Sequence, residues 1–155
     1  MQPLFEARSD SSFVRTVRTP ELMNYFLRCP GAVWTAATIL RGGVPLGWYV
    51  LARVGGQARI ADIWVHSDSE DDWAAAYALA VNAAARDIQA CELVASACIP
   101  PAIYGVQNAG VRFVHAEPIF MLDPKKCFAQ RAQLDVTFLE SDLAYLNNPA
   151  YPYLT

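Results

Sequence analysis

The sequence predicts a domain of the α+β class (mixed α/β), with an antiparallel meander followed by a βαβ unit and a C-terminal hairpin. Two observations predict this order. The glycine pairs Gly42-Gly43 and Gly55-Gly56 separate three strand-like runs, and glycine supplies the positive φ angles that tight hairpins require. A helical run from Trp73 to Gln89 then lies between two further strand-like runs, which is the spacing of a βαβ crossover. We therefore expect one mixed sheet with helices packed against it.

One helix is expected before the meander. Thr19 can cap its first turn, and Pro20 stands where its missing N–H is not needed. Apolar residues follow at helical spacing, and the helix should end near Cys29. Residues 1–12 are mostly polar, so we expect a frayed tail or a short edge strand there.

The meander ends in the stretch around which the chain is organised. Its three strands are expected at Ala32–Leu40, Leu46–Val54 and Arg59–His66. The last strand alternates, so that Asp62 and Trp64 share one face while Ile63 and Val65 share the other. An acidic turn follows, in which Ser69 is the expected N-cap of the long helix.

The remaining elements are shorter. After the long helix we expect, in order, a strand at Cys91–Ala97, a short helix at Pro101–Asn108, a hairpin of Val111–Ala116 and Pro118–Leu122, a last strand at Val136–Leu139 and one helical turn at Ser141–Leu146. The strand after the long helix should lie parallel to the strand before it, because a βαβ unit joins them. We expect a single domain over residues 1–155, with its core at about 20–124 and a C-terminal extension at 125–155.

Composition excludes several classes of function. The chain is 54% hydrophobic and 17% charged, with a net charge of −3, and it lacks the basic face that nucleic-acid binding requires. It contains no apolar run of the roughly 20 residues that a membrane helix needs, and no signal peptide. We therefore expect a soluble cytoplasmic protein with no nucleic-acid or membrane partner.

The cysteines predict neither a metal site nor a disulfide framework. The four thiols, Cys29, Cys91, Cys98 and Cys127, show no paired ligand spacing. The chain has only two histidines that could complete a zinc site. We expect reduced thiols and no bound metal.

The order of elements resembles the fold of the Gcn5-related N-acetyltransferase superfamily over roughly residues 20–124. The matching stretches are Gly47–Leu51, Ala58–Val65 and Gly110–Phe113, and Phe138–Tyr145 is similar to the endings of some members. The resemblance implies an acyl-CoA-dependent N-acyltransferase that acts on a small-molecule amine of unknown identity. It also suggests the second half of a two-domain member, so that either a homodimer or a missing N-terminal domain would complete the assembly.

The same resemblance implies where acetyl-CoA would bind. In this superfamily the fourth strand and the next one splay apart, and the pantetheine arm lies in the gap. Carried over, the backbone of Ile63, Trp64 and Val65 would contact that arm, and the pyrophosphate would lie on the N–H groups of the helix that begins near Trp73.

The phosphate loop departs from the superfamily pattern. It should contain glycines and an arginine, but residues 67–74 contain neither and carry Asp68, Glu70, Asp71 and Asp72. Each carboxylate within ~6 Å of a phosphate charge opposes binding by roughly 2–3 kcal/mol at an effective dielectric constant of about 20. The helix end attracts an anion by only ~0.3–1 kcal/mol. An alternative is therefore a catalytically degenerate module that serves in ligand binding or dimerisation.

Two residues are candidates for the chemistry. Asp62 could remove a proton from the amine, and the alternative is a structural aspartate paired with an arginine such as Arg53 or Arg59. Tyr104 could protonate the thiolate that leaves, although the superfamily spacing counted back from Gly110 falls elsewhere. The alternative for Tyr104 is a packed side chain.

Overall fold

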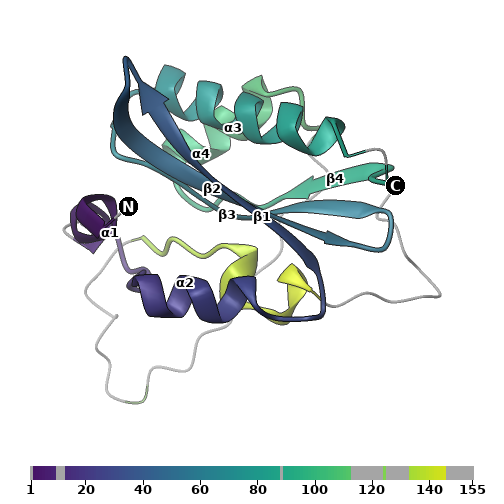
Figure 1. Cartoon of the computed structure of the whole chain (residues 1–155). Coiled ribbons are helices and arrows are strands. Elements are labelled where there is room, and N and C mark those ends of the chain that lie inside the picture. Colours follow the sequence, from purple (N-terminus) through teal and green to yellow (C-terminus); the bar gives the residue numbers. More distant parts are fainter. Residues whose placement is uncertain (1, 10–12, 88, 113–123, 125–132, 146–155) are drawn as a thin grey trace.

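The computed structural model describes residues 2–9, 13–87, 89–112, 124 and 133–145 (Figure 1). They form a mixed sheet of four strands in the order β1-β2-β3-β4. The strands are β1 (Val33–Arg41), β2 (Val44–Val54), β3 (Gln57–Val65) and β4 (Glu92–Ala95). The first three pair antiparallel, and β4 pairs parallel with β3. The structure confirms the predicted meander and βαβ unit.

The tight turns of the meander depend on glycine. Gly42 and Gly43 have φ angles of 55° and 83°, and Gly55 has a φ angle of 58°. Residues with a Cβ rarely adopt these angles, so the glycines fix where the chain reverses. The register they set places Trp48 of β2 opposite Trp64 of β3.

Helices cover both faces of the sheet (Figure 1). On one face lie α3 (Glu70–Ala85) and α4 (Pro100–Asn108). On the other face lie α2 (Pro20–Leu27) and the 3₁₀ turns η1 (Phe138–Glu140) and η2 (Asp142–Ala144). The remaining helix, α1 (Gln2–Ser9), reaches the β2 strand through Phe5, whose ring lies 5.0 Å from that of Trp48.

The α3 and α4 helices approach each other closely at Gly105. A Cβ at Gly105 of α4 would lie 2.7 Å from Cδ2 of Tyr77 and 2.9 Å from the Trp73 carbonyl oxygen. Only glycine allows this approach. The long helix ends at Ala85 rather than at the predicted Gln89.

Two predictions for the chain termini were wrong. Residues 2–9 form a helix instead of a tail or edge strand, because Leu4, Phe5 and Arg8 become buried on one side of it. The predicted strand Val136–Leu139 is absent, because Thr137 and Glu140 form a capping box that begins a 3₁₀ turn. The turn expected after it is present as η2. Most of the predicted hairpin at 111–122 lies outside the described residues.

Candidate functional site

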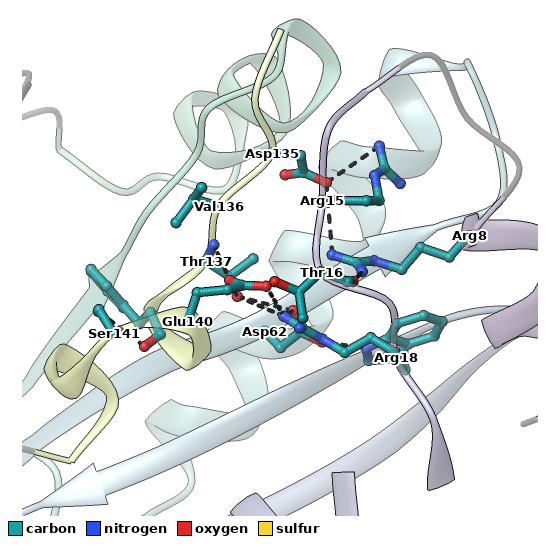
Figure 2. Close-up of polar contacts among 12 residues, drawn as sticks. Arg8, Arg15, Thr16, Arg18, Asp62, Asp135, Val136, Thr137, Glu140 and Ser141 are labelled. Carbon is teal, nitrogen blue, oxygen red and sulfur yellow. Dashed lines mark hydrogen bonds and ion pairs between the residues drawn. The ribbon is translucent and has the colours of Figure 1, made fainter. Parts of the chain in front are cut away.

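The candidate site is centred on Asp62, in the middle of β3. Its side chain is fully buried and points to the face covered by α2 and η1. The residues around it come from three distant parts of the chain. Arg18 precedes α2, and Trp48 lies on β2. Thr137 is the N-cap of η1, and Glu140 is the last residue of η1 (Figure 2). We call these five residues the Asp62 cluster.

Four donor groups surround the Asp62 carboxylate. Oδ2 accepts hydrogen bonds from Arg18 Nε at 3.2 Å and from Trp48 Nε1 at 2.8 Å. Oδ1 accepts from Arg18 Nη2 at 2.9 Å and lies 3.1 Å from the Thr137 hydroxyl. Burial alone would raise the pKa of Asp62, but the charge and hydrogen bonds of Arg18, helped by Arg8 and Trp48, hold this pKa below the ordinary value. The carboxylate is therefore a stable buried anion.

Arg18 joins two carboxylates in the interior. Besides Asp62, it contacts Glu140 through Nη2. Burial alone would lower the pKa of Arg18, but these two carboxylates raise it above the ordinary value. Glu140 also accepts a hydrogen bond from the Thr137 backbone N–H at 2.6 Å. The cluster thus ties η1 and its N-cap residue Thr137 to the middle of the sheet.

A second group of charges lies next to the Asp62 cluster (Figure 2). Asp135 Oδ2 lies 3.3 Å from Arg15 Nη2 and 3.9 Å from Arg8 Nη2. Burial raises the pKa of Asp135, although Arg15 and Arg8 act in the opposite direction. The backbones pair here as well, since the Val14 N–H donates to Gln133 and the Val14 carbonyl accepts from Asp135. The segments before α2 and before η1 are therefore held together by charge and by backbone hydrogen bonds.

This geometry does not favour Asp62 as a general base. A base needs a free lone pair within reach of the substrate, whereas Asp62 is enclosed by donors. An open pocket of about 340 Å³ at the junction of α1 and α2 is lined by Arg18 but not by Asp62. The arginine partner of Asp62 is Arg18, and neither of the two arginines considered from the sequence. Arg53 instead pairs with Asp87 at 2.6 Å, and Arg59 donates to Gln57 at 2.6 Å.

Tyr104 lies on α4, on the face of the sheet opposite the Asp62 partners. Its side chain is half-buried, and α4 packs against α3. The sheet separates Asp62 from Tyr104, so the structure does not bring the two predicted catalytic residues into one site. Their catalytic roles stay predictions.

The predicted cofactor residues on β3 lie along an edge that β4 does not cover. The parallel ladder ends where Ile60 pairs with Ala95, and β3 continues to Val65. The His66 N–H donates a hydrogen bond to the carbonyl oxygen of Leu46 in β2 at 2.7 Å. Because N–H directions alternate along a strand, Ile63 and Val65 turn their backbone groups toward the edge on the β4 side, beyond the end of the β4 ladder, and Trp64 turns its groups to β2.

The start of α3, where the predicted phosphate contacts lie, carries acidic side chains and a buried tryptophan. Trp73 is buried, and its indole N–H donates to the Ser67 carbonyl at 2.9 Å, so its side chain belongs to the core. Ser69 takes the N-cap position but makes no side-chain cap hydrogen bond. Asp72 turns back to pair with Arg41 of β1. The other three acids of the turn, Asp68, Glu70 and Asp71, are exposed.

The sequence reasoning missed four members of the Asp62 cluster, namely Arg18, Trp48, Thr137 and Glu140. A signal existed for two of them, because Thr followed three residues later by Glu is the pattern of a capping box. No local pattern marked Arg18, which lies 44 residues from Asp62 in the sequence.

The described residues hold no group of three or more His, Cys, Asp or Glu side chains arranged to bind a metal. Among the helices that the structure describes, none combines the length and the apolar character needed to cross a membrane. In comparisons with known proteins, the chain matches no family model, no curated protein and no solved structure.

Proposed function

We propose that this chain is a catalytically degenerate module of acetyltransferase-like fold, which serves in dimerisation rather than in acyl transfer. One observation carries the proposal: the carboxylate expected to act as the base, Asp62, is buried and enclosed by Arg18, Trp48 and Thr137. A group held in this way stabilises the fold. It is not placed to take a proton from an incoming amine.

The acidic turn supports the same proposal. Asp68, Glu70 and Asp71 are exposed around the first turn of α3, where a pyrophosphate would have to bind. Their charges oppose the phosphates of CoA more strongly than the helix end attracts them. The pairing of Asp72 with Arg41 removes only one of the four charges.

The edge strand β1 supports dimerisation. Within the described part of the chain, no strand pairs with its outer edge. Val33 and Leu40 of β1 and Val44 at the start of β2 are each more than half exposed. Natural edge strands are commonly protected by lysine or proline, but β1 carries a single charged residue, Arg41, which pairs with Asp72. A second copy could pair with β1 in antiparallel fashion and extend the sheet across a two-fold axis.

A second candidate function is an acyl-CoA-dependent N-acyltransferase for an amine. The end of the β3–β4 ladder at Ile60 favours it, because among the described residues no strand pairs with the backbone groups that Ile63 and Val65 turn to this edge, where a pantetheine arm would lie. This candidate requires a base other than Asp62 and phosphate contacts away from the acidic turn.

Sedimentation velocity of the chain over a range of concentrations tests the proposal. We expect a monomer–dimer equilibrium that shifts to the dimer as concentration rises. A monomer at every concentration would contradict dimerisation. Release of CoA from acetyl-CoA in the presence of amines would contradict the catalytic half of the proposal and support the second candidate.

A further inference from the structure

The Arg8 guanidinium is buried with one edge unused. The residue is 1% exposed, and its Nη1 contacts the Thr16 carbonyl. Its Nε and Nη2 atoms are also buried but have no hydrogen-bond partner. These two nitrogens form the side-on edge of the planar group, which donates two parallel hydrogen bonds to a carboxylate or phosphate.

The surroundings of Arg8 hold three arginines, including Arg8 itself, and three carboxylates, those of Asp62, Asp135 and Glu140. Arg18 pairs with Asp62 and Glu140, and Asp135 is the carboxylate that Arg8 and Arg15 both face. That carboxylate does not fill the Arg8 edge, because its Oδ2 atom lies 3.9 Å from Nη2, too far for a hydrogen bond.

Arg15 provides a further unused donor beside this edge. Its Nη2 faces Asp135, and its guanidinium lies 5.2 Å from the centre of the Phe13 ring. Its Nε is buried and has no hydrogen-bond partner. Arginine keeps its charge in proteins, so these donors cannot be relieved by losing a proton. Arg8 Nε, Arg8 Nη2 and Arg15 Nε are therefore three buried N–H donors that lack an acceptor among the described residues.

We propose that Arg8 and Arg15 bind a small oxyanion of the carboxylate or phosphate class, next to Asp135. The side-on edge of Arg8 would hold two of its oxygens, and Arg15 Nε would donate to one of them. Such an anion would join α1 to the paired segments around Val14 and Leu134. The proposal is independent of acyl transfer, since these residues lie on the sheet face opposite α3 and α4.

The test is titration of the whole chain with sodium phosphate and with sodium acetate, at ionic strength held constant with sodium chloride. The readouts are the melting temperature and backbone amide NMR shifts. We expect a saturable rise in melting temperature, with shift changes at Arg8, Arg15 and Asp135. Tighter binding of glycerol phosphate than of phosphate would assign the oxyanion to a larger ligand, and equal binding would assign it to the free ion.

Three variants separate a binding role from a structural one. Arg8→Lys keeps the charge but removes the two-donor edge, so we expect the anion affinity to fall by about tenfold. Asp135→Asn removes the competing carboxylate and should increase the affinity, which a purely structural role would not do. Arg53→Gln removes the same charge at the Asp87 pair and should leave the affinity unchanged. Stabilisation that follows ionic strength alone, or that is equal in the wild type and Arg8→Lys, would overturn the proposal.

Discussion

Arg18 and Asp62 form a doubly hydrogen-bonded ion pair in the interior, with both side chains at 0% exposure although the residues lie 44 positions apart in the sequence. The pair joins the segment before α2 to the middle of β3. Because Arg18 also contacts Glu140, it extends to the segment that carries η1. This relationship explains why an aspartate occupies a buried strand position that otherwise favours apolar residues.

The first prediction concerns the removal of one partner from this pair. Asp62→Asn places an amide N–H₂ among the donors of Arg18 and Trp48 and leaves the arginine without its main counter-charge. We expect the free energy of unfolding to fall by ~3–5 kcal/mol, as measured by urea denaturation. Asp87→Asn breaks the more exposed pair with Arg53 and should cost less than about 1 kcal/mol. Equal costs for the two variants would contradict the structural role of Asp62.

The second prediction concerns acid stability. The pKa of Asp62 is lower in the folded state than its ordinary value of 3.8. The stability that the Asp62 carboxylate contributes is therefore present above pH 3.8, and it is lost as the pH falls through the folded-state pKa. We expect the free energy of unfolding to decrease as pH falls below about 4, as measured by urea denaturation at a series of pH values. A stability that stays constant down to about pH 2 would show that Asp62 is not held as an anion.

Asp135 gives a third prediction, of opposite sign. Burial raises the pKa of Asp135 in the folded state, so the folded state favours the protonated side chain. The stability that this side chain contributes is complete below pH 3.8, and it is lost as the pH rises through the folded-state pKa. Asp135→Asn should therefore lose less stability than the wild type between about pH 4 and about pH 7. Parallel stability curves for the two proteins over this range would contradict the direction of the shift.

The fourth prediction concerns the edge strand. Neighbouring residues of a strand turn their N–H groups to opposite edges. Proline removes the N–H group, so Ala36→Pro and Ala37→Pro have different effects: one variant loses a donor that faces outward, and the other loses a donor that pairs with β2. The outward variant should abolish dimerisation in sedimentation velocity while the monomer stays folded. The inward variant should lower the melting temperature. If neither variant changes the association, β1 is not the dimer contact.

The fifth prediction concerns the contact between α3 and α4. Gly105→Ala would improve helix propensity, but its Cβ would meet the Trp73 backbone and the Tyr77 ring. We expect overpacking to dominate and to lower the free energy of unfolding by about 1–3 kcal/mol. Gln107→Ala, an exposed substitution on the same helix, is the control and should change it by less than about 0.5 kcal/mol. Unchanged stability in Gly105→Ala would show that α4 can move away from α3.

The sequence predicted the features that depend on neighbouring residues, such as tight turns and helix caps. The glycine pairs placed both hairpins of the meander, and Thr19 does cap α2 by accepting a hydrogen bond from the Leu22 N–H at 3.2 Å. The site was harder to predict, because the partners of Asp62 lie 44 residues before it and 75 residues after it. No periodicity links Arg18 or Thr137 to β3. The helix at residues 2–9 was missed because its buried residues include Arg8, which a polar pattern assigns to solvent.

Isothermal titration calorimetry of the chain with acetyl-CoA tests the central claim most directly. The matched variant replaces the exposed acids Asp68, Glu70 and Asp71 with glycine and arginine, and keeps Asp72 because it pairs with Arg41. We predict no saturable heat for the native chain, because carboxylates surround the start of α3, and measurable binding for the variant, because its helix N–H groups become accessible to phosphate. Micromolar binding of acetyl-CoA by the native chain would contradict the account.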